Sequence, residues 1–207
     1  MTPVRYLPVL CIAFLSLATP AETVPAYDLP VEAGSPLISE KSARIQMARM
    51  LQKDARAQEA IAEYRKLLAD DPSLLPARIE LAGLLTAQNQ PAEARKLLES
   101  IPVEKLDRDG LNILASIYET EGRFPDAEKI YEEILKASPG DQIARFRLSQ
   151  VLSWQKKYPE AVRILQTLVQ ERPTDIQLLR HYAQILGWAG RTKESLEIWK
   201  KTLPARH

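Results

Sequence analysis

The chain has 207 residues, of which 45% are hydrophobic, and its 28 Lys and Arg residues are balanced by 27 Asp and Glu residues. A net charge of +1 excludes the strong positive field with which proteins bind nucleic acid or anionic membranes. The 7 Gly residues are too few for phosphate-binding loops or for the tight turns of an all-β fold. One Cys and two His exclude a disulfide scaffold and most metal sites. We therefore expect a mainly helical protein with no cofactor, no metal and no catalytic residues.

The first 21 residues have the order of a secretory signal peptide. Met1–Arg5 carries one positive charge, Tyr6–Ala18 carries none, and small residues follow, so we expect cleavage after Ala18 or Ala21. As a helix the uncharged run would be about 20 Å long, shorter than the roughly 30 Å hydrocarbon core, which makes a retained anchor the weaker alternative. The sequence thus predicts an exported protein, periplasmic or envelope-associated, with no membrane span after cleavage.

Residues 22–40 form a predicted linker, because three prolines and one glycine interrupt any helical or strand period. These residues are Pro25, Pro30, Gly34 and Pro36. The segment is either a flexible tether or an extended arm that lies along a neighbour or along its own groove. We expect it to end where Ser35 and Pro36 begin a helix as N-cap and first-turn proline.

A period of 34 residues organises the sequence from residue 41 to residue 207. Each of five similar strings carries one small residue at the same place, at spacings of 34, 33, 34 and 34: Ala60, Ala94, Ala127, Ala161 and Ser195. A second small residue lies about a dozen positions before each: Ala48, Ala82, Ala115, Ser149 and Ala183. A closing proline follows in three copies, whereas the second copy closes early at Ile101 and Pro102, which accounts for the spacing of 33.

This pattern resembles the tetratricopeptide repeat family, whose units have the same period, two small residues and a closing proline. The resemblance implies an all-α fold, a right-handed α-solenoid of about five helix-turn-helix repeats. The expected repeats are residues 41–74, 75–107, 108–141, 142–175 and 176–207. In the fourth repeat we expect helices at Gln142–Gln155 and Pro159–Glu171, and Asp141 and Asp175 suit the N-caps of the helices that follow them. The glycine that is usual between the two helices survives only at Gly122 and Gly190.

Function in such folds lies on the concave face, which the first helix of each repeat lines. At 100° per residue, Leu148, Val151 and Leu152 form the core stripe of the fourth repeat. The opposite side of that helix carries Ile143, Phe146, Gln150, Ser153 and Trp154. Candidate partner-binding residues on this side, in repeats one, three, four and five, are Arg49, Lys53, Asn112, Glu119, Phe146, Gln150, Trp154, Arg180, Gln184 and Trp188.

Trp154 and Trp188 are one period apart, so stacking makes them neighbours, and Trp is enriched at binding hot spots. One hypothesis is a peptide-binding groove with an aromatic anchor in its C-terminal half. The alternative is that each Trp packs against the adjacent repeat. Trp199, four residues after Ser195, is predicted to be a core residue, and His181 a surface or groove residue rather than a ligand.

The sequence predicts a non-catalytic scaffold or adaptor in the bacterial envelope, which binds a partner segment and supports assembly or secretion machinery. The strings LSWQKKYPEA and LGWAGRTKES resemble those in envelope repeat proteins that accompany exopolysaccharide export and outer-membrane secretion. No polar capping helix follows the last repeat, so either its last helix is itself polar enough, with Lys193, Glu194, Glu197, Lys200 and Lys201, or another molecule covers it. One alternative function is therefore a self-assembling component whose uncapped ends stack head to tail. The other is an accessory subunit of an envelope enzyme or of an exopolysaccharide export complex.

Overall fold

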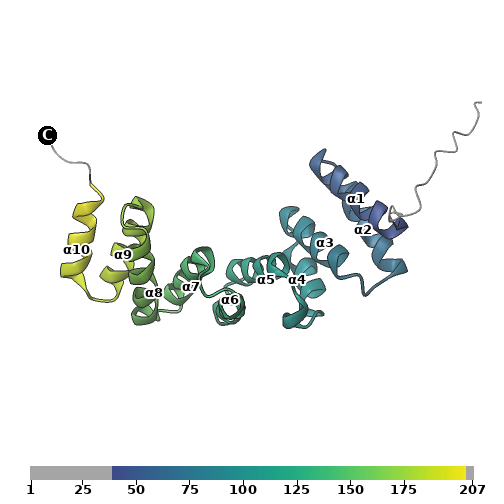
Figure 1. The fold of residues 1–207 in the computed structure, drawn as a ribbon. Coiled ribbons are helices and arrows are strands. Elements are labelled where there is room, and N and C mark those ends of the chain that lie inside the picture. Colours follow the sequence, from purple (N-terminus) through teal and green to yellow (C-terminus); the bar gives the residue numbers. More distant parts are fainter. Residues whose placement is uncertain (1–38, 204–207) are drawn as a thin grey trace, which may run out of the picture. The chain divides into compact units, whose positions relative to one another are not determined.

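A computed structural model describes residues 39–203, so the predicted signal peptide and most of the predicted linker lie outside the described residues (Figure 1). Within this range the chain forms ten α-helices and one 3-10 turn, and no strand. None of these helices is both long enough and apolar enough to cross a membrane. The elements in order are α1 (Glu40–Lys53), α2 (Ala57–Asp70), α3 (Leu75–Ala87), α4 (Pro91–Glu99), η1 (Val103–Lys105), α5 (Arg108–Thr120), α6 (Phe124–Ala137), α7 (Gln142–Trp154), α8 (Tyr158–Glu171), α9 (Ile176–Trp188) and α10 (Thr192–Lys201).

The helices pack as five consecutive pairs, as the period of the sequence predicts. Within each pair the first helix contacts the second, and the second helix of each of the first four pairs also contacts the first helix of the next. The all-α repeat fold expected from the sequence is therefore confirmed. The shortened second repeat is visible as well, because α4 has only nine residues and is followed by the 3-10 turn η1.

Short polar side chains fix where several first helices begin. The carboxylates of Asp107, Asp141 and Asp175 accept hydrogen bonds from the backbone N–H groups three residues later, at 2.8, 2.9 and 3.0 Å. The N-cap roles expected for Asp141 and Asp175 are thus confirmed. The first described helix begins at Glu40 with Ser39 as its N-cap, whereas the expected start at Ser35 and Pro36 lies outside the described residues.

The turn between the two helices of each repeat uses the same backbone conformation five times. One residue in each turn has a positive φ, between 59° and 77°, although only two of the five are glycine. These residues are Ala55, Asn89, Gly122, Lys156 and Gly190. Glycine marked this turn in two repeats only, because the other three adopt the left-handed conformation without glycine, the residue that favours it most.

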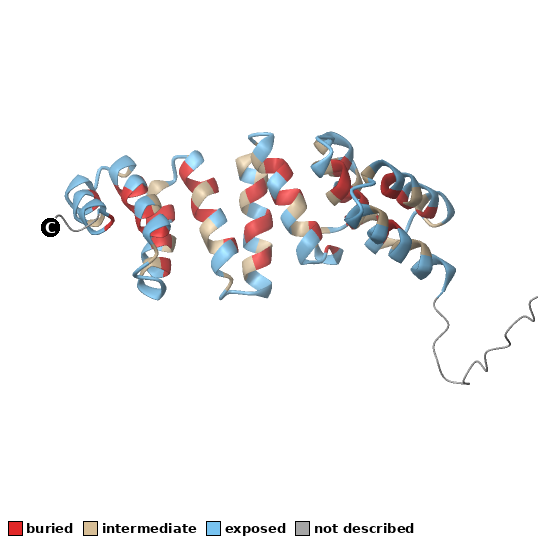
Figure 2. Cartoon of the chain, turned by 90° about the horizontal axis from the view of Figure 1, so that it is seen from above, coloured by how far each residue is buried: buried red, intermediate tan, exposed pale blue. Residues whose placement is uncertain are grey.

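The core runs through the whole stack as a continuous band of buried residues (Figure 2). The two small residues of each repeat are buried, which lets its two helices approach closely. In the last repeat the Ser195 hydroxyl even donates a hydrogen bond of 2.7 Å to the Ala183 carbonyl oxygen. Four residues after the small residue of each second helix, a large side chain is buried in the first four repeats: Tyr64, Leu98, Tyr131 and Leu165.

Trp199 holds this same position in the fifth repeat, but it is not a core residue. Its side chain is 38% exposed, so the prediction that it is buried was wrong. In the other repeats the following first helix covers this position, and no helix in residues 39–203 packs on that side of α10.

Candidate partner-binding surfaces

A groove of about 560 Å³ lies along the first helices of repeats one to three. We call it the N-terminal groove; its lining includes Arg49 and Gln52 of α1, Ile79 and Glu80 of α3, and Asp109 and Asn112 of α5. An adjoining hollow shares Arg49, Glu80 and Asp109 and adds Lys53. The structure thus brings together Arg49, Lys53 and Asn112, three of the residues that the sequence singled out.

Glu80 is the central charge of this groove and ties the first two repeats together. Its carboxylate accepts hydrogen bonds from the Arg49 guanidinium, at 2.5 and 3.0 Å, and from the Tyr64 hydroxyl, at 2.5 Å. Burial by itself raises the pKa of Glu80, but the bonds from Arg49 and Tyr64 more than offset it and hold the pKa below its usual value. Burial and the same carboxylate raise the pKa of Tyr64. Glu80 is therefore a fixed negative charge at neutral pH.

The floor of the N-terminal groove is apolar and tightly packed. Ile79 and Leu84 of α3 are buried, and Ile113 of α5 packs against the core. A Cβ atom at Gly83 would lie 3.4 Å from the Cδ1 atom of Ile113, so the glycine lets α5 approach α3 closely. The groove therefore offers an apolar base between charges of both signs.

Glu119, another candidate, is already engaged within the protein. Its carboxylate accepts a hydrogen bond of 2.6 Å from the Tyr131 hydroxyl and lies 3.9 Å from the Arg147 guanidinium of the next repeat. This arrangement parallels the one at Glu80, since in both a Tyr and an Arg hold a carboxylate near the contact between repeats. Glu119 thus links repeats three and four.

Each of the two tryptophans packs against the preceding repeat and is also partly exposed. Trp154 lies against Phe124 with ring centroids 5.1 Å apart, and Trp188 lies against Tyr158 at 6.2 Å. In each pair the Trp ends a first helix and its partner begins the second helix of the preceding repeat. Yet the tryptophans remain 45% and 51% exposed, so each presents much of its ring outward. The pairs form a line of exposed aromatic surface, which we call the aromatic edge.

Other candidates on this side of the stack are less accessible than helix projection suggests. Phe146 is half-buried and packs against His181 of α9, with ring centroids 5.0 Å apart. Ser153, expected on the open side, is buried, and its hydroxyl donates a hydrogen bond to the Gln150 carbonyl oxygen at 2.7 Å. His181 is partly buried: its Nε2 atom has no hydrogen-bond partner among the described residues, and burial lowers its pKa. Phe146 and His181 thus pack repeats four and five together.

Polar candidates of the C-terminal half are scattered around this contact. The Gln150 side-chain oxygen accepts a long hydrogen bond of 3.4 Å from Arg147. Arg180 donates a bond of 3.5 Å to the Thr202 carbonyl oxygen, which directs its guanidinium toward the end of α10. Gln184 is exposed. These three residues therefore do not form one cluster with the N-terminal groove.

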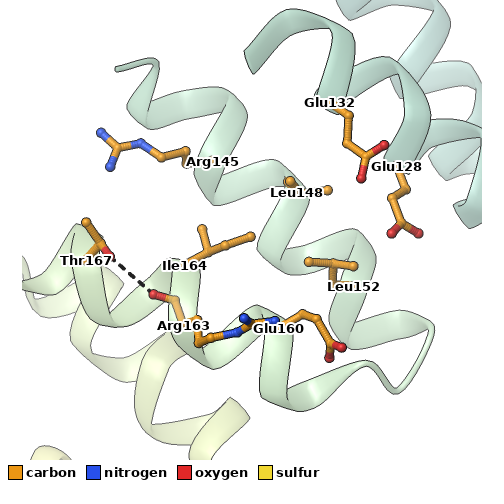
Figure 3. A pocket seen from close by; sticks show the side chains of 9 residues that line it. All are labelled: Glu128, Glu132, Arg145, Leu148, Leu152, Glu160, Arg163, Ile164 and Thr167. Carbon is orange, nitrogen blue, oxygen red and sulfur yellow. Dashed lines mark hydrogen bonds between the residues drawn. The ribbon is translucent and has the colours of Figure 1, made fainter. Parts of the chain in front are cut away.

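A second cleft, of about 470 Å³, lies between α6, α7 and α8 (Figure 3). Leu148 and Leu152 of α7 lie between Glu128 and Glu132 of α6 on one side and the side chains of α8 on the other (Figure 3). The Arg145 guanidinium is bound to Glu171 at 2.8 and 3.0 Å. Sequence reasoning missed this cleft, because Leu148 and Leu152 were assigned only to the core. The only hint in the sequence was the spacing of four between Glu128 and Glu132, which places both carboxylates on the same face of a helix.

The chain is similar to known proteins in sequence and in fold. The family model described as tetratricopeptide repeat matches residues 51–117 and 120–185. Among solved structures, MamA has a TM-score of 0.71 at 16% identity, and the match covers 79% of this chain and 90% of MamA. YrrB, described as a TPR protein with an unusual peptide-binding site, has a TM-score of 0.70 at 18% identity, with coverage of 77% and 82%. At these identities the likeness concerns the fold alone.

Two curated bacterial proteins are similar over part of the chain. An uncharacterized protein y4yS of Sinorhizobium fredii is 32% identical over 89 residues, which are 42% of this chain and 49% of that protein. Cellulose synthase operon protein C of Pseudomonas fluorescens is 28% identical over 135 residues, 61% of this chain and 11% of that protein. The match therefore spans about half the length of one relative and about a tenth of the other.

Proposed function

Because this chain belongs to the tetratricopeptide repeat family, whose members are protein-interaction scaffolds, we propose that it is a non-catalytic adaptor of the bacterial envelope. It binds an extended segment of a protein partner along the N-terminal groove and anchors an apolar side chain of that partner on the aromatic edge. The observation that carries this proposal is the groove itself, which three consecutive first helices line with apolar and charged groups.

The chemistry of the N-terminal groove suits a peptide better than a small metabolite. Asn112 is exposed, and its amide can both donate to and accept from a peptide backbone. Lys53 and Asp109 lie nearby as charges of opposite sign, while Arg49 is held in place by Glu80. A segment with apolar residues between acidic and basic ones is complementary to this arrangement.

The aromatic edge supplies the kind of surface that dominates binding energy. Trp154 and Trp188 are already held on one side by Phe124 and Tyr158, so little side-chain freedom remains to be lost on binding. Rigid, half-exposed aromatic rings are typical hot-spot residues. That YrrB is described as having a peptide-binding site supports a peptide ligand for a protein of similar fold.

The envelope location rests on the predicted signal peptide in residues 1–21. It is tested by expressing the full chain in a Gram-negative host and determining the N-terminus of the protein recovered from the periplasmic fraction. We expect the mature chain to begin at Thr19 or Glu22. Recovery of uncleaved protein in the cytosol would refute the location and leave the adaptor function standing.

A second candidate function is that of an accessory subunit in an exopolysaccharide export complex. The similarity to a cellulose synthase operon protein over 135 residues favours it. The two proposals differ in the partner, because an accessory subunit remains with an enzyme or exporter through purification, whereas an adaptor exchanges its client.

The adaptor is tested by affinity purification of the tagged mature chain from envelope extracts, with mass spectrometry of the proteins recovered. Two variants are run beside the parent: Lys53→Glu/Asn112→Ala for the groove, and Trp154→Ala/Trp188→Ala for the edge. A matched control, Gln166→Ala, changes an exposed residue of α8, on the second helix of its repeat. We expect one discrete partner with the parent and the control, and a loss of at least tenfold with either variant.

Each outcome must be read with the fold verified by circular dichroism. Equal recovery by both folded variants would place the binding site elsewhere and overturn the proposal. Loss with the edge variant alone would confine the site to the C-terminal half. A partner with polysaccharide synthase or export activity, retained at stoichiometric amounts, would favour the accessory subunit.

A further inference from the structure

The N-terminal end of the stack exposes two methionines at positions that are buried in every other repeat. Met47 of α1 is 44% exposed and Met50 is 67% exposed. The residues that correspond to Met47 in the next four repeats are Leu81, Leu114, Leu148 and Tyr182, and those that correspond to Met50 are Leu84, Ile117, Val151 and Ile185. All eight are buried, because the second helix of the preceding repeat lies close to the first helix that carries them.

The C-terminal end exposes the complementary half of the same contact. Leu196 and Leu203 of the last repeat are 55% and 63% exposed, beside the half-exposed Trp199. One period earlier, Val162 and Leu165 are buried against the helix that follows. Among the described residues, the last repeat therefore carries an apolar face, Leu196, Trp199 and Leu203, that no following helix covers.

We infer that α10 of one copy docks on α1 of a second copy, head to tail, and so repeats between molecules the contact that joins repeats within the molecule. Four internal examples show the geometry: α2 on α3, α4 on α5, α6 on α7 and α8 on α9. A second copy is the occupant that fits, since its first helix presents Met47 and Met50 at the positions that fill this contact elsewhere.

Charges across this junction are complementary as well. Inside the stack, the Arg65 guanidinium of the first repeat binds the Glu93 carboxylate of the second at 2.9 Å. Lys200 holds the position of Arg65 in the last repeat, and Glu59 holds the position of Glu93 in the first. Docking in the same register places Lys200 of one copy opposite Glu59 of the next.

The contact is heterologous, because it joins two different faces of the protein. It therefore leaves one free face at each end of the assembly and produces linear oligomers rather than a symmetric dimer. A single junction involves one helix on each side, which is small compared with the interfaces of permanent oligomers. The association is therefore expected to be concentration-dependent, with a monomer in dilute solution and longer linear oligomers at higher concentration.

Two variants of the mature chain, each blocked at one end, give a sharp test. The head variant is Met47→Glu/Met50→Glu, and the tail variant is Leu196→Glu/Leu203→Glu. The replaced side chains are largely exposed, so the fold is expected to survive, which circular dichroism verifies. Sedimentation velocity is measured for the parent, for each variant and for their equimolar mixture, from micromolar to roughly millimolar concentration.

We expect the parent to form a series of species that grows with concentration, and each variant alone to stay monomeric. The mixture should stop at a dimer, because the free tail of the head variant meets the free head of the tail variant and no further end remains. Ile143→Glu, which makes the same chemical change at a 71% exposed site within α7, is the matched control and should associate like the parent.

Several results would overturn the inference. A parent that stays monomeric over the whole range excludes docking. Association of the tail variant alone would mean head-to-head contact, and association of the head variant alone tail-to-tail contact. Loss of association in Ile143→Glu would move the contact to the first-helix side of the stack.

Discussion

Trp154 rests on Phe124 of the preceding repeat, with their ring centroids 5.1 Å apart and their planes inclined by 37°. Trp154 is only partly buried by this contact, since 45% of the residue remains exposed. Replacing Trp154 by Ala therefore removes only part of what a buried Trp contributes. We expect a loss of about 2 kcal/mol in the free energy of unfolding, below the roughly 3–5 kcal/mol of a fully buried Trp.

Urea denaturation of Trp154→Ala, Phe124→Ala and the double variant checks this expectation. The double-mutant cycle should give a coupling of about 0.5–1.5 kcal/mol, which is typical of aromatic pairs. A loss above roughly 3 kcal/mol for Trp154→Ala would mean that the residue serves the core. In that case the Trp variants would not be usable as binding probes.

The turn residues Ala55 and Lys156 hold a left-handed backbone, with φ of 59° and 61°, without being glycine. This conformation costs an L-residue about 1–2 kcal/mol. A glycine avoids that cost, but its greater freedom in the unfolded chain lowers the free energy of unfolding by about 0.4–1 kcal/mol. Ala55→Gly and Lys156→Gly should each stabilise the protein by roughly 0.5–1 kcal/mol, measured by urea denaturation. Ala62→Gly, at an exposed position within α2, is the control and should destabilise by about 1 kcal/mol.

These turns also mark what the sequence was able to predict. The helices could be predicted from the small residues that recur every 34 positions and from Asp141 and Asp175 as N-caps. An N-cap depends only on the residues next to it in the sequence, so it can be recognised without the tertiary structure. The turns of three repeats stayed hidden, because the tertiary contacts on both sides impose a conformation that Ala55 and Lys156 do not favour and that Asn89 adopts without being glycine.

The errors at single residues have a common physical cause. Projection of a helix at 100° per residue gives the direction of a side chain from its own axis, but not which neighbouring helix meets it. Phe146, which His181 of α9 partly covers, and Ser153, which is buried, were therefore placed on an open side. Trp199 was assigned to the core because it follows the small residue Ser195 by four positions on a second helix, and periodicity does not say what covers the last repeat.

Glu80 should stabilise the first two repeats in a pH-dependent manner. Its pKa in the folded protein lies below the usual 4.5, so its stabilisation is complete above about pH 4.5 and is lost as the pH falls through the folded pKa. At neutral pH, Glu80→Gln is expected to cost about 1–2 kcal/mol, because the Arg49 guanidinium loses its carboxylate. The difference between parent and variant should narrow as the pH falls below 4.5.

Urea denaturation at several pH values measures this difference. Glu132→Gln, an exposed residue of α6, is the control and should change the free energy of unfolding by less than about 0.5 kcal/mol. A difference between parent and Glu80→Gln that did not vary with pH would contradict the assignment.

His181 should also make the stability depend on pH, but at higher pH values than Glu80. Burial between Phe146 and the core lowers its pKa below the usual 6.5, so the unfolded chain binds more protons than the folded one just below that pH. Stability should therefore fall as the pH drops from about 6.5 toward the pKa of the folded state. In the variant His181→Leu, the urea midpoint should no longer show this fall in stability when it is measured between about pH 5 and pH 7.5. An unchanged profile would show that the imidazole titrates alike in both states.

The shortened second repeat has a consequence for how the protein unfolds. In a stack where each repeat contacts only its neighbours, folding is cooperative only as far as those contacts couple one repeat to the next. Helix α4 has nine residues where α2, α6 and α8 have 14, so it offers less surface to α5. Direct packing of α3 on α5, which Gly83 permits, supplies the remaining contact between repeats two and three. Amide exchange should therefore show repeats two and three opening together, because both α3 and α4 hold α5.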